Sequence, residues 1–398
     1  MNKHLLLTII GLLSVSILWA AKPVKKSKKV KEDPYAASVA EVDSLFYILD
    51  DEKETATVTV PSDRNYYVGM KEIPEVIKVK RHLYSVVAVG EGAFEGCKGL
   101  TGVKFPATVV TIGDRAFKDC TKLKNITFPT DLVSLGTEAF MNSGVRAAKM
   151  PKTVLEMGDR AFAGTPVKSA SFGREMTAIP EGAFQGCREL TKVTISDGIT
   201  EIEEDAFADC ISLQNVVVPE GVTTLSKRAF KGCSALMSAK LPQSLKKLED
   251  EAFADCAALQ TVNLPAGLEK VGNEVFRGCV AIPNALVFGS TLLLVPTSES
   301  GEYVVPDNIK SIAGGAFSGC NNITAVRFHG GISELVKHTF IGCNGIERID
   351  LPRSIRKVED EAFLNCTGLR FVIVRGETEV ADEAFAGCYN LTSIVHNN

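Results

Sequence analysis

The sequence predicts an α/β solenoid, a stack of about thirteen short coils. A seven-residue box, first seen as Glu91-Gly-Ala-Phe-Glu-Gly-Cys97, recurs along the chain. Its phenylalanine returns after 22 or 23 residues, with a single gap of 41. A fixed period of this length indicates a stacked repeat architecture. The thirteen box phenylalanines are Phe94, Phe117, Phe140, Phe162, Phe184, Phe207, Phe230, Phe253, Phe276, Phe317, Phe340, Phe363 and Phe385.

Each repeat unit predicts one strand and one short helical turn. The stretch Leu190–Ile195 ends in alternating apolar and polar residues, which is typical of a half-buried strand. In the box Asp114–Cys120, the alanine, phenylalanine and cysteine are spaced as on one face of a helical turn. The aspartate three residues before the phenylalanine is a suitable N-cap for that turn.

A single unit of this length cannot bury its own apolar face. Stacked units share a continuous core, and their strands lie about 4.8 Å apart in a parallel ladder. We therefore expect a right-handed, curved stack with a parallel β-sheet on the concave face and the helical turns on the other side.

The repeat pattern L-x-x-V-x-I-P-x-x-V-x-x-I-x-x-x-A-F-x-x-C resembles the BspA-like leucine-rich repeat family of bacterial surface proteins. The resemblance covers about Phe94 to the C-terminus, and the preceding segment resembles that family's N-terminal cap. It implies a leucine-rich-repeat solenoid, secreted or displayed at the cell surface, that binds other macromolecules such as host matrix components or other cells. It does not supply a ligand.

The N-terminal part predicts export. Residues 1–21 resemble a signal peptide, with Lys3 and His4 before an apolar run and small residues at its end. Residues 22–40 form a basic flexible linker, and residues 41–92 a β-rich N-terminal cap. Residues 93–398 hold the solenoid.

Charge and motifs exclude several function classes. The chain has 44 basic and 48 acidic residues, and with seven lysines before Glu32 the rest carries a net charge of −11. An acidic exported protein argues against nucleic-acid partners. Nucleophile-elbow, phosphate-loop and zinc-protease motifs are missing. We therefore expect no enzyme activity, cofactor, metal or small-molecule substrate.

Two irregular regions are candidate contact sites. The long gap predicts a hairpin insertion at about residues 283–306, with a Gly289-Ser290 turn. It either touches a partner or is a tolerated surface excursion. The last coil has no polar cap, so we also consider self-association there.

Every cysteine lies three residues after a box phenylalanine, so one buried structural thiol per coil is expected instead of a disulfide. The other two boxes carry Ser143 and Thr165 at this position. The predicted core ladder includes Phe94, Cys97, Phe117, Cys120, Phe184, Cys187, Phe207, Cys210, Phe230, Cys233, Phe253 and Cys256.

The outward positions of the strands are the candidate binding residues. A polar strip with recurring cations suits an acidic or extended protein partner, although a solvated face gives the same pattern. His329 and His338 flank one strand end, either as a shared site or as solvated turn residues. The concave-face candidates are Lys104, Lys149, Lys192, Thr194, Lys240, Arg327 and Arg348.

Two functions fit these observations. The first is a non-catalytic, secreted or cell-surface protein that mediates adhesion or protein–protein interaction. The alternative is a structural scaffold of the periplasm or cell envelope. Surface exposure separates them.

Overall fold

The computed structural model describes residues 38–60 and 67–397. The predicted signal peptide at residues 1–21 and the linker as far as residue 37 lie outside these ranges. Strand β1 (Ser38–Val42) begins before residue 40, so the linker ends earlier than its composition predicts. All regular structure in the described ranges is strand, and no helix there is long and apolar enough to cross a membrane.

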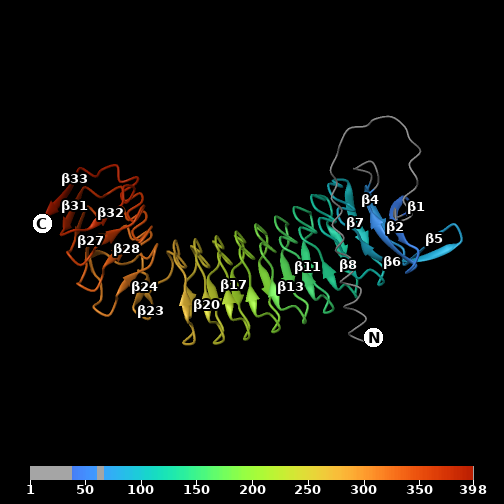
Figure 1. The fold of residues 1–398 in the computed structure, drawn as a ribbon, viewed down its shortest axis with the longest axis horizontal. Helices are drawn as coiled ribbons and strands as arrows, with labels where there is room; N and C mark the ends of the chain where they lie inside the picture. Colours follow the sequence, from blue (N-terminus) through green and yellow to red (C-terminus); the bar gives the residue numbers. More distant parts are fainter. Residues whose placement is uncertain (1–37, 61–66, 398) are drawn as a thin grey trace. The chain divides into compact units, whose positions relative to one another are not determined.

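An antiparallel meander precedes the repeats (Figure 1). β1 pairs with β2 (Leu45–Asp50), and β2 pairs with β3 (Thr55–Thr59). β5 (Val76–Val79) and β6 (His82–Val89) form a second antiparallel pair. β3 pairs with β6 in parallel, and β6 pairs with β8 (Thr111–Ile112). Backbone pairing therefore continues from the meander into the first coils.

The coils contribute strands to a first parallel ladder, as predicted. Equivalent residues of successive coils pair without offset, as in Ala148, Ala170 and Val193. The first-ladder strands are β4 (Gly69–Glu72), β7 (Leu100–Lys104), β9 (Asn125–Thr127), β11 (Ala147–Lys149), β13 (Ser169–Ser171), β15 (Lys192–Thr194), β17 (Asn215–Val217), β19 (Ser238–Lys240), β21 (Thr261–Val262), β25 (Gly301–Val304), β27 (Ile323–Arg327), β29 (Arg348–Leu351), β31 (Phe371–Arg375) and β33 (Ser393–Asn397).

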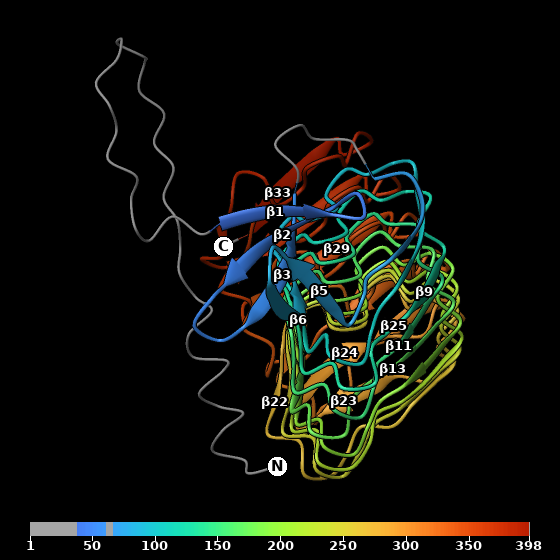
Figure 2. The ribbon, with the colours of Figure 1, turned by 90° about the vertical axis from the view of Figure 1, so that its right-hand side faces the viewer.

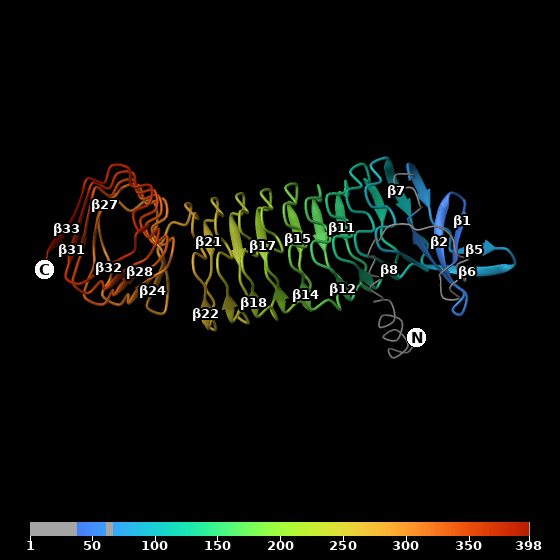
Figure 3. The same cartoon turned by 45° about the horizontal axis from the view of Figure 1, so that its top comes forward.

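A second parallel ladder, which the sequence did not predict, lies on the other side of the coils (Figures 2 and 3). Most of its strands have only two residues, and the second is usually buried, as at Ile202 and Leu225. After β8 its members are β10 (Ser134–Leu135), β12 (Glu156–Met157), β14 (Ala178–Ile179), β16 (Glu201–Ile202), β18 (Thr224–Leu225), β20 (Lys247–Leu248), β22 (Lys270–Val271), β24 (Thr291–Leu294), β26 (Ser311–Ile312), β28 (Glu334–Leu335), β30 (Lys357–Val358) and β32 (Glu379–Val380).

The box forms turns, and the predicted helical turn is not confirmed. In the second box, Arg115 and Asp119 flank Phe117 at two residues' distance with φ of 52° and 59°. Positive φ at two positions four residues apart is incompatible with a right-handed helix through the box. The amides of Arg115, Phe117 and Asp119 instead donate to carbonyls of the next box. The box is therefore a third hydrogen-bonded contact between coils.

Two of the box aspartates bond to the equivalent residue of the next coil and do not cap a helix. Asp114 Oδ1 accepts the backbone N–H of Thr137 at 2.8 Å, and Asp250 Oδ1 accepts that of Asn273 at 2.8 Å. Each acceptor occupies the same box position as the residue whose amide it receives. The aspartate predicted as an N-cap thus helps to set the register between coils.

Phenylalanines and cysteines fill the core in continuous stacks. From Phe94 to Phe276, neighbouring rings lie 4.9 to 6.0 Å apart with planes within 3–8° of parallel. All eleven cysteines are buried free thiols. Each Sγ from Cys120 onward contacts a carbonyl of the preceding coil, as Cys210 does with Phe184 at 3.2 Å. Close packing of this kind excludes water from the core.

The long gap contains an extra coil that lacks a box. β23 (Leu286–Phe288) and β24 form an antiparallel hairpin, and β24 also pairs with β26 of the next coil. Val295 occupies the box position: its N–H donates to Ala316, and its carbonyl faces Cys320 Sγ at 3.5 Å. The hairpin replaces the first-ladder strand of this coil.

The hydrophobic core divides at this coil. We call the coils up to Phe276 the first array and those from Phe317 onward the second array. Leu293 and Leu294 pack with the core of the first array, whereas Leu292 and Val295 pack with that of the second. We call the boxless coil and its contacts on both sides the joint.

Candidate functional site

The structure places all seven predicted binding residues on the outward side of the first ladder, exposed to solvent. We call this surface the strand face. Lys149 pairs in register with Ser171 and Thr194, while Lys192 belongs to the neighbouring outward row with Ser169. Arg327 lies on β27 and Arg348 on β29, both in the second array. The candidates therefore share one face but do not form a single cluster.

Two of the predicted cations are paired with acids that the sequence analysis missed. Lys104 Nζ lies 2.7 Å from Glu72 Oε1 on β4. Arg327 forms a two-pronged pair with Glu302 on β25, at 2.6 and 3.2 Å. Both acids lie on strands outside the regular units, so the period gave no signal for them.

Three hollows lie along the strand face. One, of about 680 Å³, lies beside Lys104 and Thr127, with Met70 and Phe105 in its wall. A second, of about 510 Å³, lies beside Lys240. A third, of about 400 Å³, includes Arg327 and Arg348. Four of the seven predicted residues therefore line or adjoin concave surface.

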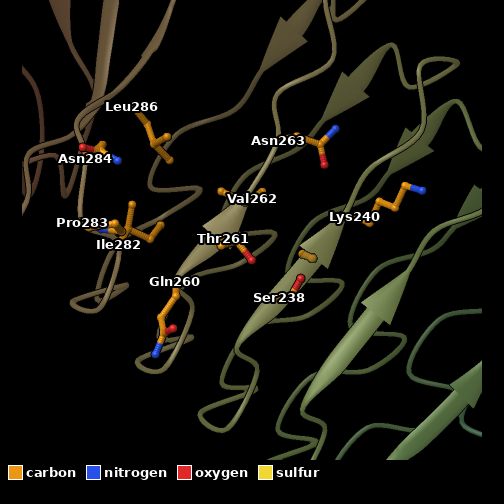
Figure 4. A pocket seen from close by; sticks show the side chains of 11 residues that line it. Ser238, Lys240, Gln260, Thr261, Val262, Asn263, Ile282, Pro283, Asn284 and Leu286 are labelled. Carbon is orange, nitrogen blue, oxygen red and sulfur yellow. The ribbon is translucent and has the colours of Figure 1, made fainter.

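The second hollow lies where the first ladder is interrupted (Figure 4). β21 pairs only with β19, because the next coil contributes the β23–β24 hairpin in place of a first-ladder strand. Val262 is half-buried, as Val193 is, whereas its counterparts Val216 and Ala239 are 2% exposed. Asn263 hydrogen-bonds the backbone N–H and carbonyl of Leu241 and so closes the end of the ladder.

The two histidines do not share a site. His329 Nδ1 accepts the N–H of Gly331, a local turn contact. His338 instead lies between two carboxylates, with Nδ1 2.7 Å from Glu274 and Nε2 2.9 Å from Glu361. Glu274 belongs to the first array, so His338 ties the two arrays together across the joint. This role could not be foreseen from the sequence, because 64 residues separate the partners.

The surroundings of the thiols suit a structural role. Burial raises the pKa of Cys187 to about 11 and that of Cys233 to about 12, so both are protonated at neutral pH. Protonated, buried thiols are poor nucleophiles and poor metal ligands. In residues 38–60 and 67–397, no group of three or more His, Cys, Asp or Glu is arranged to hold a metal ion.

Comparison with solved structures supports the fold. The chain is similar to a leucine rich cell surface protein from Faecalibacterium prausnitzii A2-165, at 24% identity over 91% of this chain and 96% of the other, with a TM-score of 0.56. It is also similar to a leucine-rich repeat protein from Bacteroides ovatus ATCC 8483, at 22% identity over 89% and 94%, with a TM-score of 0.65. No curated protein matches the chain.

The repeats themselves match a known family. Three ranges, residues 77–191, 177–292 and 297–398, match the family model described as the BspA type leucine rich repeat region (6 copies). The matched residues cover most of the chain and include both arrays and all of the joint except residues 293–296. The chain therefore belongs to the BspA type leucine-rich repeat family.

Proposed function

We propose that this protein is exported, displayed at the cell surface, and binds other proteins through its strand face. The carrying observation is the strand face itself: seven exposed polar side chains in two rows, three hollows, and no bulky cover from other elements in the described residues. Family membership supports this proposal, because leucine-rich repeats typically serve in protein–protein interaction and not in catalysis.

Adhesion to host matrix or to other cells is the use of this face that we favour. A repeated face offers many similar weak contacts, and such contacts add up when several are made together. The description of the Faecalibacterium relative as a cell surface protein is in keeping with this location. The predicted signal peptide supplies the route of export.

Protease shaving of intact cells tests the location. Release of peptides from residues 93–398 before the cells are opened is the expected result. Protection of these residues until the envelope is broken would contradict surface display and favour the envelope scaffold. A cytoplasmic marker protein, followed in the same samples, controls for lysis.

A further inference from the structure

The third hollow has an unusual charge arrangement. Its wall holds three guanidinium groups, from Arg327, Arg348 and Arg375, and two carboxylates, from Glu302 and Asp350. All five side chains come from consecutive first-ladder strands, β25 to β31; β25 precedes the second array, and the other strands belong to it. The hollow thus carries a local net charge of +1 on an otherwise acidic protein.

Both carboxylates are already paired. Glu302 forms its two-pronged pair with Arg327, and Arg375 forms another with Asp350 at 2.6 and 2.7 Å. Planar, two-pronged pairs of this kind are the strongest geometry available to arginine and carboxylate. They hold the two outer guanidinium groups in fixed positions at either side of the hollow.

Arg348 is the remaining cation. It lies on β29, two residues before Asp350, it is exposed, and no carboxylate among the described residues forms an ion pair with it. Hydrogen bonds from Arg375, with the nearby charge of Arg348, hold the pKa of Asp350 below its usual value. Arg348 is therefore near enough to shape the field of the hollow while its own donors remain available.

Exposed apolar side chains lie beside two of the arginines of the hollow. Phe371 pairs in register with Arg348 and is 49% exposed, and Val304 pairs with Arg327 and is 55% exposed. Val326 and Phe328 contribute to the wall of the hollow. Exposed aromatic side chains beside arginine are the composition found at the energetic centres of protein interfaces.

We propose that this hollow binds an acidic, extended segment of a partner protein, with one partner carboxylate on Arg348 and apolar partner side chains against Phe371 and Val304. The inference rests on the proposed function and names the partner chemistry of one part of the strand face. A single unpaired guanidinium matches a monoanionic carboxylate. A phosphate group would place more negative charge between Glu302 and Asp350, which would repel it.

The test uses the purified chain and three synthetic peptides that alternate valine with glutamate, glutamine or phosphoserine. Binding is measured by fluorescence anisotropy at low and high salt. We expect the glutamate peptide to bind about tenfold or more tightly than the glutamine peptide, and the preference to shrink at high salt. Equal binding of these two peptides, or binding of the phosphoserine peptide alone, would overturn the proposal.

Three variants show whether the effect depends on Arg348, and two of them, Arg348→Gln and Arg356→Gln, change the charge equally. Arg348→Gln should remove the preference for glutamate, and Arg348→Lys should retain part of it, because lysine offers charge without the planar fork. Arg356→Gln is the control, since Arg356 is exposed in the same coil beside the second ladder. If Arg348→Gln and Arg356→Gln lose the preference for the glutamate peptide equally, the effect is one of overall charge, and the proposed site is wrong.

The result is separable from that of cell shaving. If the repeats are exposed on cells but the protein binds the glutamate and glutamine peptides equally, the proposed binding site is wrong and the proposal of surface display stands. If the protein prefers the glutamate peptide but the repeats are protected from protease in intact cells, the proposed binding site stands and surface display is wrong.

Discussion

The first and second arrays are built from the same unit, but the contacts at the joint differ from those within either array. Within the first array, successive boxes exchange backbone hydrogen bonds, and the phenylalanine rings stack almost in parallel. At the joint, side chains also form the hydrogen bonds that link the coils. Gly314 donates its N–H to Asn273 Oδ1, and His338 reaches Glu274 past the Phe317 box.

Glycine makes this reach possible. A Cβ on Gly314 would lie 2.7 Å from the carbonyl oxygen of Lys337, and one on Gly315 would lie 2.7 Å from Cβ of Arg277. Gly315 also has φ of 71°, where a side chain is strained. The comparison teaches that a strict period lets repeated backbone pairing and the box aspartates fix the register of coils. Where the period fails, fewer backbone bonds remain, and side chains such as Asn273 and His338 add to them.

The largest expected effect separates the two cores. Phe207→Ala removes a fully buried ring from the first array and should cost about 3–5 kcal/mol of unfolding free energy. Because repeats contact mainly their neighbours, the loss of amide protection should be concentrated in the first array. Hydrogen exchange followed by mass spectrometry measures this, with Phe340→Ala as the matched change in the second array. Uniform loss in both arrays would contradict two separate cores.

High pH should weaken the thiol ladder. Burial raises the pKa of Cys187 from 9.0 to about 11, so the unfolded chain releases this proton first as pH rises. The stabilising effect is complete below pH 9 and is lost between pH 9 and 11, by on the order of 2 kcal/mol for this thiol. Urea unfolding across this range should show the decrease. Cys187→Ser should reduce this decrease by the contribution of one thiol, and an unchanged decrease would contradict the assignment.

Loss of the histidine should loosen the joint alone. His338→Leu leaves Glu274 and Glu361 without this partner, at a cost of about 1–3 kcal/mol. We expect faster amide exchange in the β23–β24 hairpin and unchanged protection around Phe207. His329→Leu, with only a local turn contact, serves as the control. Equal exchange in both variants would show that His338 does not tie the arrays.

The smallest effect lies inside the first array. Ser143 Oγ is buried and has no hydrogen-bond partner among the described residues, whereas cysteine at this position usually donates to the preceding coil. Ser143→Cys should therefore stabilise the protein by about 1 kcal/mol. Thr165→Cys should gain less, since Thr165 Oγ1 already bonds Phe162 at 2.7 Å. Thermal unfolding compares them, and an equal or reversed order would contradict this explanation.

The sequence predicted the repeating coil because Phe184 and its counterparts recur with a period that only stacking explains. It also placed the polar positions of the strand face, since alternation around Val193 separates inward from outward residues. Strands such as Glu201–Ile202 were missed, because two residues are too short to show alternation.

The box was misjudged as helical because spacings of three and four also arise in consecutive turns. The left-handed backbone at Arg115 and Asp119 distinguishes consecutive turns from a helical turn. Glycine, asparagine or aspartate two residues after the box phenylalanine, as at Asp119, is the sequence signal that could have indicated these turns. The pairs Arg327–Glu302 and His338–Glu274 could not be predicted, because they depend on the boxless coil and their partners do not recur with the repeat.

Binding of the purified chain to matrix proteins and intact cells tests the central claim most directly, when two charge-matched variants are compared. One replaces Lys104, Lys149, Lys240 and Arg327 of the strand face with alanine. The other replaces Lys247, Lys270, Lys310 and Arg356, all exposed on or beside second-ladder strands. Our account predicts a loss of about tenfold or more in the first variant and near-normal binding in the second. Equal binding by both variants would contradict recognition through the strand face.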